Sequence, residues 1–131
     1  MTRDAGPGIV AVVGDIRREV GMAGEARAAE HLASRGIRLV ERGFRCRLGE
    51  VDIVAFDGAT LVFCEVKTRR STRMGVPAEA VTPAKQTRIR RLAESYVALH
   101  RLGGIGIRFD VVAVRLAADG SSEIEHIPNA F

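Results

Sequence analysis

Two carboxylates and one ammonium group stand in two short apolar segments of the sequence. Asp52 lies in Val51–Phe56, and Glu65 and Lys67 lie in Leu61–Lys67. Side chains two positions apart on a strand share a face, so Glu65 and Lys67 should lie together. A hairpin between the two segments places Asp52 near their level. Carboxylates bind Mg²⁺ or Mn²⁺ together with water and phosphate oxygens, and such an ion with a nearby lysine promotes the attack of water on a phosphodiester.

The same three residues have an ordinary structural interpretation. A glutamate and a lysine two positions apart often form a simple pair at the end of a strand, with an aspartate as a capping acid. An E-x-K triplet alone therefore indicates little. The aspartate one strand earlier, together with the basic residues that follow, favours a functional site.

The basic surplus of the chain lies in one segment. From Lys67 to Arg91 there are eight basic residues and one acidic residue, whereas the flanking segments are slightly acidic. Such a block is typical of a surface that binds a phosphate backbone, although a solvated loop and helix face would have the same composition. The candidate phosphate contacts are Arg69, Arg70, Arg73, Lys85 and Arg88. Aromatic residues make up only 5% of the chain, so base stacking is a poor model.

Hydrophobic periodicity and turn residues predict the elements that position these side chains. Residues 1–20 mix glycine, proline and charge and are interpreted as a flexible N-terminal arm. An alternative interpretation is that a helix begins near Asp15. A single folded domain then covers residues 21–131. Thr82 is the expected N-cap of the second helix, with Pro83 at its first position. The expected elements are a helix at 22–34, strands at 37–46, 51–56 and 61–67, a loop at 68–83, a helix at 83–102, and strands at 107–116 and 122–127. This order predicts an α/β fold with a mixed β-sheet flanked by helices.

Composition excludes several classes of protein. The chain has 131 residues, of which 47% are hydrophobic, enough for a core without a metal or disulfide staple. No apolar run is long enough to span a membrane, and no secretory signal is recognisable. The two cysteines, Cys46 and Cys64, form no metal-binding spacing. We therefore expect a cytoplasmic protein that does not bind membranes.

Two segments together resemble the PD-(D/E)xK nuclease superfamily. They are G-E-V-D-I-V-A (Gly49–Ala55) and L-V-F-C-E-V-K-T-R (Leu61–Arg69). The wider chain, from about Gly21 onward, is similar to the YraN-like family of bacterial proteins, which is regarded as endonuclease-like. The segments that carry this second resemblance are G-x-x-G-E-x-x-A (21–28), F-R-C-R-L-G-E-V-D-I-V-A (44–55), P-A-E-A-V-T-P-A-K-Q (77–86), R-F-D-V-V-A-V (108–114) and I-E-H-I-P-N-A-F (124–131).

The resemblance implies a restriction-endonuclease-like fold, similar to Holliday-junction resolvases, and a role for each matched residue. Asp52, Glu65 and Lys67 would be catalytic, with Asp52, Glu65 and Glu25 as ligands of Mg²⁺ or Mn²⁺. Glu25 is equally explained as an acid that favours the start of a helix. Gln86 resembles a polar residue that faces the nucleic acid. The Q-x-x-x-Y box of RecB-type members is missing, since Tyr96 lies ten residues beyond Gln86.

Two functions follow as hypotheses. The first is a metal-dependent nuclease that hydrolyses phosphodiester bonds of structured, for example branched, nucleic acid, with DNA expected before RNA. Resolvase-like relatives act as dimers, so a homodimer is one expected assembly. The second is a non-catalytic nucleic-acid-binding module that keeps the nuclease fold and serves as an adaptor in DNA repair or RNA processing. A weaker third interpretation is that the basic segment binds an acidic protein.

Overall fold

The computed structural model of the chain describes residues 9–70 and 81–131, with side chains from Val20 onward. The predicted order of elements is confirmed. In chain order they are α1 (Ile9–Ser34), β1 (Arg38–Cys46), β2 (Gly49–Asp57), β3 (Thr60–Arg69), α2 (Pro83–Leu99), β4 (Gly106–Leu116) and β5 (Ser122–Ile127). No helix in this described part of the chain is both long and apolar enough to cross a membrane.

The five strands form one mixed sheet in the order β1-β2-β3-β4-β5. Neighbouring strands are antiparallel except β3 and β4, which are parallel. A parallel pair needs a crossover connection, and α2 lies within it. The predicted α/β fold with a mixed sheet and flanking helices is therefore confirmed.

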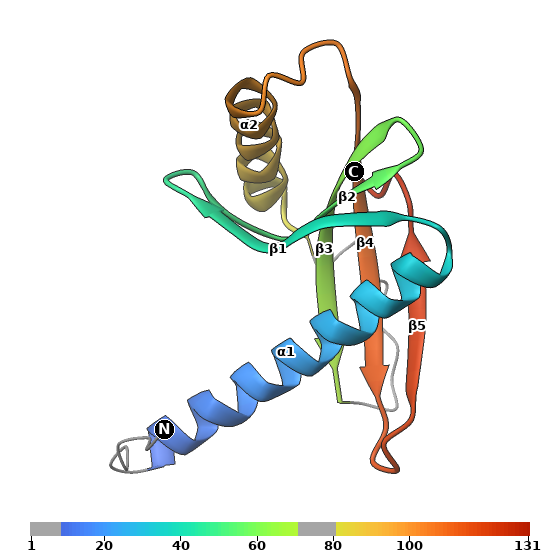
Figure 1. Ribbon diagram of the computed structural model, residues 1–131. Helices are drawn as coiled ribbons and strands as arrows, with labels where there is room; N and C mark the ends of the chain where they lie inside the picture. Colours follow the sequence, from blue (N-terminus) through green and yellow to red (C-terminus); the bar gives the residue numbers. More distant parts are fainter. Residues whose placement is uncertain (1–8, 71–80) are drawn as a thin grey trace, which may run out of the picture.

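The two helices lie against opposite faces of the sheet, and a hydrophobic core fills each side (Figure 1). α1 crosses mainly β3 and β4, whereas α2 packs against β2. The strand β3 is central and alternates between the two cores: Val62 and Cys64 face α1, and Leu61 and Phe63 face α2. Both faces of β3 are covered, which explains its continuous apolar run.

The first helix begins earlier than expected: α1 starts at Ile9, so residues 9–20 of the expected N-terminal arm are helical. The helix runs through Gly14 and Gly21 without ending. A glycine inside a helix costs about 1 kcal/mol relative to alanine, so it weakens a helix without terminating it. Residues 1–8 lie outside the described residues, as do residues 71–80 of the predicted loop. Thr68 and Arg69, also assigned to that loop, still belong to β3.

The start of α2 is built as the sequence predicts. The Thr82 hydroxyl accepts a hydrogen bond from the Lys85 backbone N–H at 3.2 Å, and Pro83 occupies the first position. The buried stripe of the helix consists of Ile89, Leu92, Ala93 and Tyr96. This cap fixes Lys85 in the first turn, which bears on the site below.

One fully buried carboxylate, Asp110, has a structural role. It accepts hydrogen bonds from the Arg108 guanidinium at 2.8 Å and from the Asn129 backbone N–H at 3.0 Å. Its other oxygen lies 2.7 Å from His126 Nε2. Together these partners offset the cost of burying a charge.

Candidate functional site

The candidate site lies where β2 and β3 separate. Their last paired residues are Ile53 and Cys64, so Asp52 and Glu65 are the next positions on each strand. Residues two positions apart on a regular strand face the same side of the sheet. Val51 instead packs in the core that faces α2 and Ile53 in the core that faces α1, so the regular alternation of β2 is interrupted at Asp52. Beyond the fork β3 is paired only with β4, so its backbone N–H groups on the side of β2 need another acceptor.

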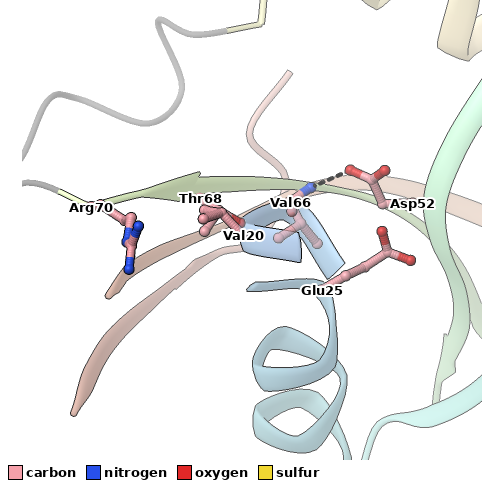
Figure 2. A pocket seen from close by; sticks show the side chains of 7 residues that line it. Val20, Glu25, Asp52, Val66, Thr68 and Arg70 are labelled. Carbon is pink, nitrogen blue, oxygen red and sulfur yellow. Dashed lines mark hydrogen bonds between the residues drawn. The ribbon is translucent and has the colours of Figure 1, made fainter. Parts of the chain in front are cut away.

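Asp52 supplies that acceptor. Its Oδ2 accepts a hydrogen bond from the Val66 backbone N–H at 2.8 Å (Figure 2). The carboxylate is held across the fork, at the level of Glu65, as the hairpin argument predicts. Asp52 thus has a structural contact, and its position also brings two acids together.

Glu65 is buried and lies beside both Asp52 and an ammonium group. The residue is only 3% exposed, and its Oε2 lies 3.3 Å from Lys85 Nζ. Burial, followed by the negative charge of Asp52, raises the pKa of Glu65 to about 7, and Lys85 opposes this shift. A carboxyl with such a pKa can exchange protons at neutral pH, and a nearby cation stabilises its charged form.

Lys67 lies on the same side of β3 as Glu65, two positions further along, as predicted. It is half-buried. Burial lowers the pKa of Lys67, the neighbouring Lys85 ammonium lowers it further, and Glu65 and Asp52 raise it. The site therefore combines two acids with two lysines. The sequence predicted Lys67 beside the acids but did not predict Lys85 there.

Glu25 lies on α1 and approaches Asp52 from the side of the sheet that α1 covers (Figure 2). The pair of Glu65 and Lys85 lies toward α2, on the other side. Glu25 and Asp52 line a cavity of about 500 Å³, together with Val66, Thr68 and Arg70. Burial, and after it the charge of Asp52, raises the pKa of Glu25, whereas Arg42, whose Nε is 3.8 Å from the carboxylate, lowers it.

Close contact between α1 and β3 gives Glu25 this position. A Cβ atom on Gly24 would lie 1.8 Å from Thr68 Oγ1, so only glycine allows the helix to come so near. The second glycine of the motif G-x-x-G-E thus has a steric explanation.

The three predicted metal ligands do not form one cluster. Asp52 lies near both others, but Glu65 faces α2 and Glu25 belongs to α1 on the other side. Within the described residues, no group of three or more acidic, histidine or cysteine side chains is arranged to hold a metal ion. Asp52 and Glu65 by themselves still fit Mg²⁺ or Mn²⁺, which bind proteins through one or two carboxylates and complete their coordination with water and phosphate oxygens.

The predicted phosphate contacts differ in their surroundings. Arg69, Arg70 and Arg88 are exposed, and Arg88 lines a cavity of about 250 Å³ beside the β1–β2 turn. Gln86 donates through Nε2 to the Val81 carbonyl at 2.9 Å and so is directed to its own backbone. Arg73 lies outside the described residues.

Two features of the site escaped the sequence analysis. Lys85 was interpreted as a phosphate contact, and the structure pairs it with Glu65. The N-cap at Thr82 already fixed the helical position of Lys85, but the direction of α2 across the sheet was needed to place it. The contact of Asp52 with the Val66 backbone also has no signal in the sequence, because it depends on where the two strands diverge.

The raised pKa of Glu65 predicts how the stability of the metal-free protein depends on pH. The pKa of the Glu65 carboxyl is 4.5 in the unfolded chain and about 7 in the folded chain. Since the folded state binds more protons between these values, the free energy of unfolding should fall as pH rises through them, by about 3 kcal/mol. Urea denaturation of wild type and Glu65→Gln from pH 5 to 8 measures this difference.

Glu65→Gln should lack this component of the pH dependence, whereas Glu125→Gln, which changes an exposed acid on β5, should keep it. An identical slope in wild type and Glu65→Gln would contradict the assignment of the shift to Glu65.

Comparisons with known proteins identify relatives of the chain. Residues 24–114 match the model of uncharacterised protein family UPF0102. A UPF0102 protein of Symbiobacterium thermophilum is 53% identical over 116 residues, covering 87% of this chain and 97% of its own length. Another of Frankia casuarinae is 49% identical over 112 residues, covering 86% and 95%. Neither the family description nor these names state an activity, so the predicted likeness to nucleases stays a prediction.

Proposed function

The chain belongs to the uncharacterised protein family UPF0102, and we propose that it is a metal-dependent nuclease acting on structured nucleic acid. One observation carries the proposal: Asp52 and the buried Glu65 meet at the fork between β2 and β3, with the ammonium groups of Lys67 and Lys85 beside them. A buried Glu65 beside the partly buried Asp52 is costly for folding alone, and a divalent ion would offset that cost. The resemblance to the PD-(D/E)xK superfamily supports the same function.

Each residue has a distinct role in this proposal. Asp52 and Glu65 would hold Mg²⁺ or Mn²⁺, and Glu25 adds negative charge near Asp52 from the α1 side. When bound, the ion makes its water more acidic and offsets charge on the phosphate. Lys67 donates a hydrogen bond to the attacking water or to a non-bridging phosphate oxygen. Lys85 neutralises Glu65 in the metal-free protein.

The substrate follows from the charges around the site. Arg69, Arg70 and Arg88 are exposed and can bind phosphates without reading base sequence, which suits recognition of nucleic-acid shape. DNA with a branch is the first substrate to test, and a homodimer is the assembly expected for paired strands of a junction. Both cysteines are free thiols, which agrees with a reducing, cytoplasmic environment.

A cleavage panel tests the activity. Purified protein is incubated with branched, duplex and single-stranded DNA and RNA, with Mn²⁺, Mg²⁺ or EDTA, and the products are resolved by length. The proposal expects cleavage of at least one structured substrate with a divalent ion and none with EDTA. Cleavage unaffected by EDTA would contradict it, since two adjacent acids without an ion repel the phosphate.

Arg88→Ala tests the electrostatic part of the interface. Removal of one phosphate contact should weaken binding to all sequences alike and reduce the slope of log affinity against log salt by about one. Fluorescence anisotropy over a series of salt concentrations measures both effects. Arg101→Ala, an exposed change beyond the end of α2, serves as the matched control. An unchanged slope in Arg88→Ala would remove this residue from the interface.

One observation favours the second function, a binding module without turnover. Lys85 already provides a positive charge next to Glu65, so the carboxylate is compensated without a metal ion. In this case the protein would bind nucleic acid as an adaptor for a repair or RNA-processing partner. Retained binding with no cleavage of any substrate in the panel would favour this function over the nuclease.

A further inference from the structure

A second cavity, of about 350 Å³, lies next to the one beneath Asp52, between α1 and the turn that joins β4 to β5. Its apolar wall includes Ala23, Leu116 and Ala117, and its charged residues are Arg27 and Arg70. Arg70 also lines the cavity that contains Asp52 and Glu25, as does Val20. The two cavities therefore adjoin along one side of α1.

The described residues that line this second cavity carry positive charge without a negative partner among them. No carboxylate is among the described residues that line it. Among the described residues, Arg27 donates a hydrogen bond from Nη1 to the Ser122 hydroxyl at 3.4 Å. The acids in and next to the turn have other partners: Asp119 accepts hydrogen bonds from Ser121, and Glu123 of β5 pairs with Arg115. Guanidinium groups beside a small apolar wall fit a ligand with both a phosphate and an apolar part.

We propose that this second cavity binds one nucleotide of an unpaired strand that continues from the scissile phosphate. Arg70 contacts the phosphate shared by the two cavities, Arg27 contacts the next one, and the apolar wall packs against the sugar or base. A hollow of this volume accommodates one nucleotide, whereas a double helix keeps its bases stacked inside and cannot enter. The inference rests on the proposed nuclease function and narrows its substrate to nucleic acid with unpaired nucleotides beside the cut.

Binding measurements with two matched probes test this inference. The probes are a blunt DNA duplex and the same duplex with an unpaired tail, each measured by fluorescence anisotropy in EDTA so that neither is cut. Wild type should bind the tailed probe more tightly. Arg27→Gln should lose about tenfold in affinity for the tailed probe, with a salt slope lower by about one, and much less for the blunt probe.

Two further variants separate the cavity from general electrostatics. Ala23→Phe fills the cavity from an exposed position of α1 without changing the charge, and it should also remove the preference for the tail. Arg35→Gln removes an exposed charge just beyond the end of α1 and should leave the preference intact.

The outcomes distinguish this inference from the proposed function. A wild type without tail preference, or equal losses for both probes in Arg27→Gln, would overturn the nucleotide site while leaving the nuclease proposal in place. The same holds if both Arg27→Gln and Ala23→Phe keep the wild-type preference. A wild type that binds neither probe and cuts no substrate of the panel would instead overturn the proposed function.

Discussion

Asp52→Asn should lower the rate of phosphodiester cleavage by at least about a hundredfold and leave nucleic-acid binding largely unchanged. The substitution removes one of the two acids that would hold the divalent ion. The amide keeps an oxygen that can accept the hydrogen bond of the Val66 backbone N–H, so the fork between β2 and β3 should keep its shape. Single-turnover cleavage and anisotropy on the same substrate separate the two effects.

Lys67→Met and Glu94→Gln complete this experiment. Lys67→Met keeps the length of the side chain without its charge and should reduce cleavage to a similar degree. Glu94→Gln removes an exposed acid of α2 and should cleave as wild type does. Wild-type cleavage rates in Asp52→Asn or Lys67→Met would show that the fork is not the active site.

Gly24→Ala should destabilise the fold by about 1–3 kcal/mol, although alanine is the better helix former. The added Cβ would lie 1.8 Å from Thr68 Oγ1 and 2.6 Å from its Cγ2, so either α1 or β3 must move. Because Glu25 is the next residue, any displacement of the helix also moves this acid away from Asp52. Thermal and urea denaturation measure the loss of stability.

Gly21→Ala is the matched control, one turn earlier in the same helix. No atom lies within 4 Å of a Cβ there, so this change should stabilise the protein by about 0.5–1 kcal/mol. Thr68→Ala removes two of the three clashing atoms and should partly rescue Gly24→Ala. A Gly24→Ala protein as stable as Gly21→Ala would contradict the close packing of α1 on β3.

The elements of the fold could be predicted because local signals mark their limits. Thr82 and Pro83 start α2, and the D-G turn at Asp57 and Gly58 separates β2 from β3. The face of the sheet toward which each apolar side chain of β3 points could not be predicted, since a strand covered on both faces is apolar throughout. The start of α1 was misplaced because glycines were given too much weight as helix breakers.

The pairing of acids in the site was predictable in part. The two-residue spacing of Glu65 and Lys67 and the hairpin register predict that both lie near Asp52 along the strands. In the structure, Asp52 accepts a hydrogen bond from the backbone N–H of Val66, which lies between them. The side of the sheet from which each group approaches was not predictable, because it depends on the change of alternation at Asp52 and on the tertiary placement of both helices. That is why Glu25 and Glu65 were expected in one cluster and lie on different sides.

The single parallel pair in the sheet has a consequence for how the site assembles over time. Asp52, Glu65 and Lys67 belong to one antiparallel hairpin, whose closure is a microsecond event in isolated segments. The alignment of Thr60 with Gly106 must wait until the chain returns across the whole crossover that contains α2, which is entropically slower. The two acids should therefore become neighbours early in folding, and Lys85 should reach them only in a late step.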